Sequence, residues 1–161
     1  MRWISIKVIF LDIDGVLNFN GCRSKIGSIY FVNDNKIKLL KEIVDATDSK
    51  IVLSSTWRMG WFDRDYNHQS LNAEHFTKLE EKMNEFGIKF MSRTPILSGG
   101  YRGEEIDSWL RKWNGENVGS FIIIDDDNDM KPHMDRLVQT SFKYGLKEKN
   151  VKKAIELLNS R

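Results

Sequence analysis

The sequence contains a single cysteine, Cys22, among its 161 residues. An intrachain disulfide is therefore impossible, and a zinc site built from several thiolates is excluded. Chains without disulfides are typical of a reducing compartment, so we expect a cytoplasmic protein.

Long apolar runs are also missing from the sequence. No stretch approaches the roughly 20 apolar residues that a membrane-spanning helix requires. The short apolar run near the N-terminus ends in acidic residues, which argues against a signal peptide. We therefore expect no membrane association.

Neither sign of charge dominates the composition. The 25 lysines and arginines against 23 aspartates and glutamates leave a net charge of +2, which alone does not indicate a nucleic-acid surface. A Gly-x-x-x-x-Gly-Lys-Ser/Thr sequence is absent, so a P-loop kinase activity is not expected.

With 40% apolar and 30% charged residues, the composition predicts a single globular domain over residues 1–161. No obligate protein partner is evident from it.

The most informative stretch is an apolar run, residues 8–11, that leads directly into Asp12 and Asp14. Such a run predicts a buried strand of a parallel sheet, and ligands bind at the carboxyl ends of such strands. Two carboxylates this close repel each other unless a cation relieves them, and Mg²⁺ prefers oxygen ligands. A calcium loop does not fit, because Val16 and Arg23 stand where ligands are due. The alternative is a strand that ends in a solvated acidic turn.

Residues 12–18 resemble motif I of the haloacid dehalogenase (HAD) superfamily. In phosphatases of this superfamily the first aspartate is the nucleophile and the second is the general acid/base. The resemblance therefore implies these roles for Asp12 and Asp14. It also implies that Asp12 and the backbone carbonyl of Asp14 bind Mg²⁺.

The rest of the chain alternates predicted helices and strands. Residues 19–32 predict a short flap beside the two aspartates, and a helix capped by Asn33 or Asp34 is expected over residues 35–46. A strand follows at residues 50–54, an order that indicates a right-handed parallel crossover. Further helices are expected over 73–86 with Asn72 as the cap, from 103 onward and over 147–159, and further strands over 88–91, 121–124 and 137–140, the last at an edge.

Residues 59–69 contain several aromatic side chains and show no clear period. We expect a loop here, on the side of the active site. Its aromatic side chains either stack on a nucleobase or pack the loop onto the body of the domain.

The second strand is followed by hydroxyl and basic side chains, Ser54, Ser55, Trp57 and Arg58 among them. Hydroxyls and an arginine at a strand end suit phosphate oxygens, although a plain polar turn would have a similar composition. In the HAD superfamily the motif II serine or threonine stands here, which implies this role for Ser54, with Ser55 as the second choice. Ser55, Trp57 and Arg58 are candidate substrate contacts. Further candidates for phosphate contacts are Arg23, Lys25 and Arg64.

Arg102 stands just before the helix expected from residue 103, and anions bind well at helix N-termini. The HAD resemblance implies that Arg102 is the motif III cation, although many members of the superfamily carry lysine. Arg93 is the competing candidate, and a solvated arginine without a role is the alternative.

A second apolar run, residues 121–124, leads into Asp125, Asp126 and Asp129. The segment again fails as a calcium loop, because Met130 and Arg136 replace the required glycine and glutamate. It resembles HAD motif IV, which implies that Asp125 binds the metal directly and that Asp126 acts through water or orients a ligand. Asp129 is a less certain third ligand.

All four motifs occur in the order that the superfamily requires, and the resemblance covers nearly the whole chain. It implies a Rossmann-like parallel sheet sandwiched by helices, without a full cap domain. The sequence around Trp57 and Arg102 is similar to small HAD domains of phage and bacterial nucleic-acid repair proteins, which are polynucleotide phosphatases. We therefore expect a Mg²⁺-dependent phosphatase whose substrate is a phosphorylated nucleic-acid end or a nucleotide. The alternatives are a 5′- or 3′-nucleotidase and a non-catalytic nucleic-acid-binding module.

Overall fold

A computed structural model describes residues 4–115 and 117–160. Its main sheet has five parallel strands in the order β5-β4-β1-β6-β7. These strands are β1 (Ser5–Leu11), β4 (Lys50–Leu53), β5 (Phe90–Arg93), β6 (Asn117–Asp125) and β7 (Leu137–Gln139). The helices are α1 (Asp34–Thr47), α2 (Arg58–Asp65), α3 (Leu71–Glu85), α4 (Arg102–Lys112) and α5 (Glu148–Asn159).

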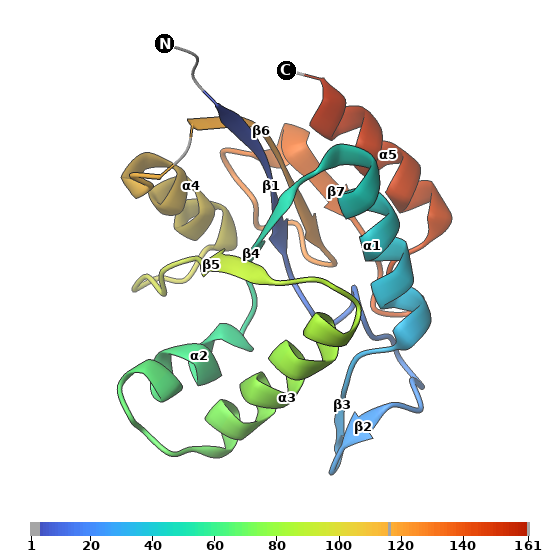
Figure 1. The fold of residues 1–161 in the computed structure, drawn as a ribbon, viewed down its shortest axis with the longest axis vertical. Helices are drawn as coiled ribbons and strands as arrows, with labels where there is room; N and C mark the ends of the chain where they lie inside the picture. The colour runs from blue at the N-terminus through green and yellow to red at the C-terminus, as the bar shows by residue number, and fades with distance from the viewer. Residues whose placement is uncertain (1–3, 116, 161) are drawn as a thin grey trace.

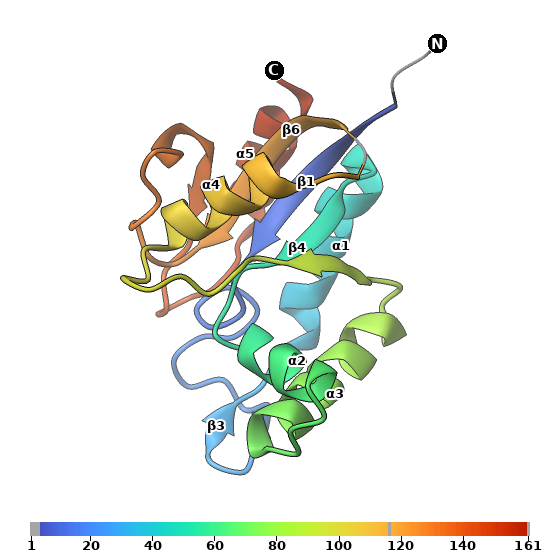
Figure 2. The same ribbon diagram turned by 90° about the vertical axis from the view of Figure 1, so that its left-hand side faces the viewer.

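Helices cover both faces of the sheet, and alternate residues of β1 contact opposite layers. Ile9 and Leu11 belong to a core that includes buried residues of α1, α3 and α5. Phe10 faces the other way and packs edge-on against Trp109 of α4, with ring centroids 5.3 Å apart. Figures 1 and 2 show α4 on one side of the sheet and α1 with α5 on the other. The predicted α/β sandwich with a parallel sheet is thus confirmed.

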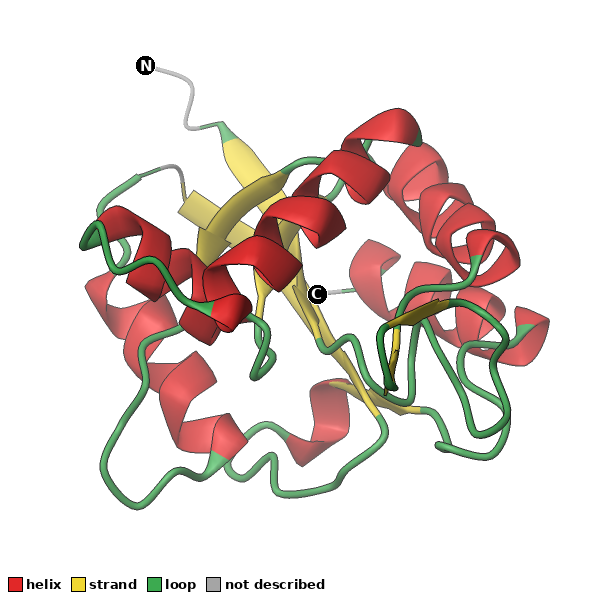
Figure 3. Cartoon of the chain, turned by 90° about the horizontal axis from the view of Figure 1, so that it is seen from below, coloured by secondary structure: helices red, strands yellow, loops and turns green. Residues whose placement is uncertain are grey.

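Segments at the carboxyl ends of the strands form the lower part of the molecule in Figures 1 and 2. The antiparallel hairpin β2 (Lys25–Ile26) and β3 (Ile29–Tyr30) is the predicted short flap. The helices α2 and α3 pack on each other beside it. Figure 3 views the molecule from this lower end, with helices on both sides of the sheet. Within the described ranges, these two insertions take the place of a full cap domain.

The prediction of a loop over residues 59–69 was wrong for its first part, which forms α2. The helix is stabilised by packing on α3, where Trp61 stacks on Phe76 with ring centroids 5.2 Å apart. A Cβ atom at Gly60 would lie 1.9 Å from the backbone oxygen of Asn72, so the two helices approach closely at a residue without a side chain. Tertiary contacts, rather than an apolar stripe in the sequence, maintain this helix.

Two helix caps and one strand also refine the predictions. Asn33, the first of the two candidates, caps α1 by accepting a hydrogen bond from the backbone of Lys36. Ser70 caps α3 instead of Asn72, because the Ser70 side chain accepts a hydrogen bond from the backbone N–H of Ala73. The helix therefore begins at Leu71, two residues before the expected start. The strand expected over residues 88–91 begins two residues later, as β5.

The 3₁₀ turn η1 (Met134–Arg136) leads into β7, which lies at the sheet edge as expected. Within the described part of the chain, none of the helices is long and apolar enough to cross a membrane.

Candidate active site

Asp12 and Asp14 follow the carboxyl end of β1, as the sequence predicts. The backbone N–H of Asp12 donates to the carbonyl of Ile124, with a nitrogen–oxygen distance of 3.0 Å, which places Asp12 beside the end of β6. Gly15 follows with a φ of +78°, and a Cβ atom there would lie 2.2 Å from a carboxylate oxygen of Asp126. Glycine is therefore required for the turn that lets Asp126 approach β1.

Three carboxylates meet at this strand end: Asp12, Asp125 and Asp126. Each offers an oxygen, and these oxygens lie within 4.8 Å of one another. Burial raises the pKa of Asp12 to about 6, although the positive charge of Arg102 opposes the rise. Burial and then the neighbouring charge of Asp12 raise the pKa of Asp125 to about 9. The cluster therefore resists holding three negative charges without a cation.

The chemistry of the three donors fits Mg²⁺, because all are carboxylate oxygens and Mg²⁺ prefers such hard ligands. Two of the side chains are buried, with 8% of Asp12 and 2% of Asp125 exposed. Asp129 is not part of this group. Its carboxylate accepts a hydrogen bond from the backbone N–H of Arg102, 3.2 Å away, and so binds the start of α4.

Arg102 begins α4, and its guanidinium donates a hydrogen bond to the backbone carbonyl of Ser54. It also lowers the pKa of Asp12, which indicates that its positive charge acts on the acidic cluster. The competing candidate Arg93 lies elsewhere: it stacks on Phe62, 3.8 Å from the ring centre, and forms an ion pair with Asp65 at 2.6 Å.

Ser54 lies at the end of β4, fully enclosed, and its hydroxyl has no hydrogen-bond partner among the described residues. A buried hydroxyl without a hydrogen-bond partner costs free energy of folding. Because this hydroxyl has no protein partner among the described residues, it is available to an oxygen atom of a ligand. The hydroxyl of the second candidate, Ser55, already accepts from the backbone N–H of Trp57 at 3.2 Å. The geometry thus favours Ser54 over Ser55.

Two side chains clamp the carboxylate of Asp14. The amide of Asn18 donates to one oxygen at 2.9 Å, and the indole N–H of Trp57 lies 3.2 and 3.3 Å from the two oxygens. Asn18 in turn accepts from the backbone N–H of Gly15 at 2.9 Å. The sequence predicts Trp57 as a substrate contact and does not predict a role for Asn18. The signal for Asn18 was its place four residues after Asp14, at the end of motif I.

The expectation that Arg58 contacts substrate is not supported by its position. Its side chain is 5% exposed and forms an ion pair with Glu105 at 2.9 Å. Its remaining contacts are donated to the backbone carbonyls of Ser55, Thr94 and Pro95. Arg58 therefore joins the segment after β4 to α4. Arg64, a further candidate, pairs with Glu80 of α3 at 2.8 Å.

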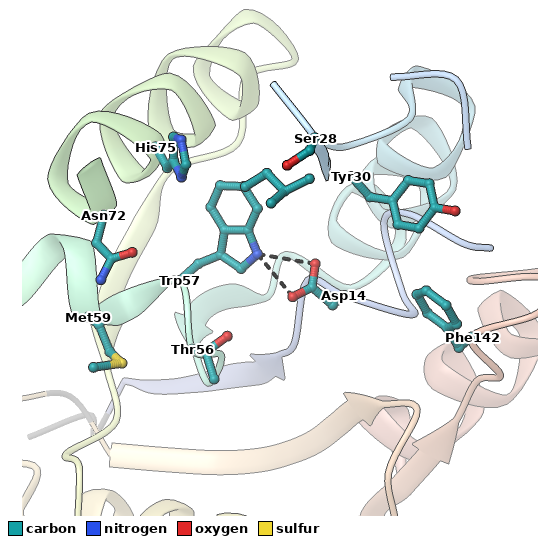
Figure 4. A pocket seen from close by; sticks show the side chains of 10 residues that line it. Asp14, Ser28, Tyr30, Thr56, Trp57, Met59, Asn72, His75 and Phe142 are labelled. Carbon is teal, nitrogen blue, oxygen red and sulfur yellow. Dashed lines mark hydrogen bonds between the residues drawn. The ribbon is translucent and has the colours of Figure 1, made fainter. Parts of the chain in front are cut away.

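A pocket of about 500 Å³ opens beside Asp14 (Figure 4). It is formed by the flap, the segment after β4, the start of α3 and the loop after β7. Its lining residues are Asp14, Ser28, Ile29, Tyr30, Thr56, Trp57, Met59, Asn72, His75 and Phe142.

The parallel sheet, the helices on both of its faces and the carboxylates at its strand ends define an α/β fold of the HAD type. Residues 8–151 match a family model described as the HAD domain in Swiss Army Knife RNA repair proteins, so the chain belongs to this family. HAD proteins are generally hydrolases and mostly phosphatases, which supports a phosphatase-type function. No curated protein matches the chain.

Proposed function

We propose that this protein is a Mg²⁺-dependent phosphomonoester hydrolase that acts through an aspartyl-phosphate on Asp12. The proposal rests on the different surroundings of two aspartates, Asp12 and Asp14. Asp12 is buried among the carboxylates of Asp125 and Asp126, whereas Asp14 is clamped and lines the adjacent pocket. A nucleophile and a proton donor for the leaving group need such separate positions.

The proposed reaction has two steps. A carboxylate oxygen of Asp12 attacks phosphorus, the bond from phosphorus to the leaving oxygen breaks, and Asp14 gives that oxygen a proton. Water then attacks the phosphorus of the aspartyl-phosphate and loses a proton to Asp14, which releases phosphate and restores Asp12. A well-placed group such as Asp14 contributes a factor of about 10² to 10⁴. The hydroxyl of Ser54 and the guanidinium of Arg102 would bind the remaining phosphate oxygens.

Asp12, Asp125 and Asp126 would hold Mg²⁺, together with the backbone carbonyl of Asp14 that the HAD resemblance implies. When bound, the ion would offset the negative charge that otherwise keeps the phosphate from Asp12. The clustering of three carboxylates also argues against the alternative of a non-catalytic binding module, because binding alone does not require it.

The family description refers to RNA repair, which supports a phosphorylated nucleic-acid end as the substrate. A nucleotidase is the second candidate, favoured by the pocket beside Asp14. Its volume of about 500 Å³ suits one nucleoside rather than a long strand.

The test is Mg²⁺-dependent phosphate release from a matched panel. The panel contains RNA and DNA oligonucleotides with a 3′- or a 5′-phosphate, and the corresponding nucleoside monophosphates. The proposal expects release that EDTA abolishes and that Asp12→Asn lowers by about 10³-fold or more, with the fold unchanged by circular dichroism. The matched control is Asp127→Asn, an exposed neighbour outside the cluster. Activity of Asp12→Asn close to that of the unmodified protein would contradict the assignment of Asp12 as the nucleophile.

A further inference from the structure

The pocket beside Asp14 lies where the leaving group of the proposed reaction must be, because Asp14 is the proposed donor of its proton. Residues from five separate segments line it, and Figure 4 shows their side chains around a common space. A volume of about 500 Å³ is within the usual range for a site that binds a small organic group. The pocket therefore bears on which leaving group fits.

Aromatic rings stand on two sides of this pocket. On one side Tyr30 of the flap and Phe142 of the loop after β7 lie with ring centroids 6.0 Å apart. On the other side Trp57 and His75 lie with centroids 6.1 Å apart. Figure 4 shows Trp57 and His75 on one side of Asp14, and Tyr30 and Phe142 on the other. Rings placed in this way suit a flat aromatic group, since bases stack on such side chains irrespective of sequence.

The charges of the pocket disfavour a second phosphate within it. Its lining includes the carboxylate of Asp14 and, among the described residues, no lysine or arginine. A nucleic-acid backbone phosphate would find no counter-charge there. Lys25 of the flap does not line the pocket, although its ammonium lies 5.5 Å from the centre of the Tyr30 ring. The pocket thus suits an uncharged base, with the continuing backbone at its rim.

Hydrogen-bonding groups are available beside the rings. The side chains of Ser28, Thr56 and Asn72 line the pocket and form no hydrogen bonds with other residues in the part of the chain that the structure describes. Side-chain hydroxyls and amides can pair with the edges of a base that is free of its complementary strand.

We propose that this pocket holds the single unpaired base of the terminal nucleotide whose phosphate is removed from a nucleic-acid end. The proposal rests on the proposed phosphatase function and adds the form of its substrate. Tyr30 and Phe142 bind one part of this nucleoside, and Trp57 with His75 bind the other. A base paired to a second strand has to leave its stack before it can enter, which costs free energy. The protein therefore prefers single-stranded or frayed ends over blunt duplex ends.

The experiment compares three oligonucleotides with the same terminal phosphate. The first is single-stranded with a normal terminal base, the second has an abasic terminal residue, and the third is the first strand in a blunt duplex. We expect kcat/KM for the first to exceed both others by about tenfold to a hundredfold. Phe142→Ala should reduce this advantage by about tenfold, mainly through KM. The matched control is Tyr66→Ala, because Tyr66 is 77% exposed and lies outside the pocket.

Equal rates on the normal and abasic ends would overturn the base pocket and leave the phosphatase function intact. Equal rates on the single strand and the blunt duplex would overturn the need for an unpaired base. Binding of the same oligonucleotides to the inactive Asp12→Asn variant, followed by fluorescence anisotropy, gives a second readout that does not depend on turnover. Base-dependent binding without any phosphate release would support the pocket and contradict the proposed reaction instead.

Discussion

The two sides of the site differ in their chemistry and in the elements that build them. The strand-end side consists of the carboxylates of Asp12, Asp125 and Asp126 with the guanidinium of Arg102, all at the ends of strands or the start of a helix. The pocket side consists mainly of aromatic, apolar and uncharged polar side chains from the segments between the strands of the main sheet, including the flap and the starts of α2 and α3. The sheet thus carries the charges that suit a phosphate and a metal ion, and the connections carry the surface that suits a leaving group. Asp14 belongs to both sides.

If this division is correct, a change on the strand-end side affects every substrate alike. Asp125→Asn removes a buried carboxylate of the cluster, so phosphate release should fall on the order of 10³-fold for all phosphomonoesters. Mg²⁺ should also lose most of its stabilising effect in thermal unfolding. A loss confined to nucleic-acid substrates would contradict the division.

Arg58 joins the segment after β4 to α4, because it pairs with Glu105 in a buried ion pair. Arg58→Ala leaves the Glu105 carboxylate buried without its partner, so the free energy of unfolding should fall by about 3–5 kcal/mol. The matched control is Arg111→Ala, whose ion pair with Asp107 lies at the surface and is worth about 0–1 kcal/mol. Chemical denaturation measures both. Equal effects of the two substitutions would contradict the structural role of Arg58.

The strand-end side also predicts how pH acts on the metal-free protein. The pKa of Asp125 rises from its ordinary 3.8 to about 9, so the folded protein keeps a proton that the unfolded chain releases. The free energy of unfolding of the metal-free protein should therefore fall as the pH rises between these two pKa values, 3.8 and about 9. Mg²⁺ displaces that proton, so its affinity should rise by about tenfold per pH unit between about pH 6, the pKa of Asp12, and about pH 9, the pKa of Asp125. Calorimetry at pH 6, 7 and 8 measures this slope, and a flat affinity would contradict it.

Asp14 links the two sides through the indole N–H of Trp57. Trp57→Phe keeps a ring in the pocket but removes the donor, so kcat should fall by about tenfold with little change in KM. The loss should be smaller for p-nitrophenyl phosphate, whose leaving group needs little protonation, than for an alkyl phosphate. Trp61→Phe is the control, because that indole lies outside the pocket. Equal losses on both substrates would indicate that Trp57 only supports packing.

The strand-end side could be predicted from the sequence because its signals are local. An apolar run that ends in aspartates identifies both a buried strand and the groups at its end, as at Asp12 and Asp125. The order of strands and helices likewise predicted the parallel sheet. These features depend on neighbours along the chain.

The pocket side depends on contacts between distant residues, which a single sequence does not reveal. Trp57 donates to Asp14 across 43 positions, and Arg58 forms a buried ion pair with Glu105 of α4. The helix α2 was missed for the same reason, since it is stabilised by packing on α3. His75 and Phe142 reach the pocket from segments that carry no motif.

We expect Asp12 to become phosphorylated during turnover. Rapid acid quenching in the presence of substrate, followed by borohydride reduction, converts an aspartyl-phosphate into homoserine, which mass spectrometry locates in the chain. If Asp12 is the nucleophile, this conversion occurs at position 12, depends on Mg²⁺ and is absent from Asp12→Asn. Phosphate release at full rate with no modified residue, or with the modification at another aspartate, would contradict it.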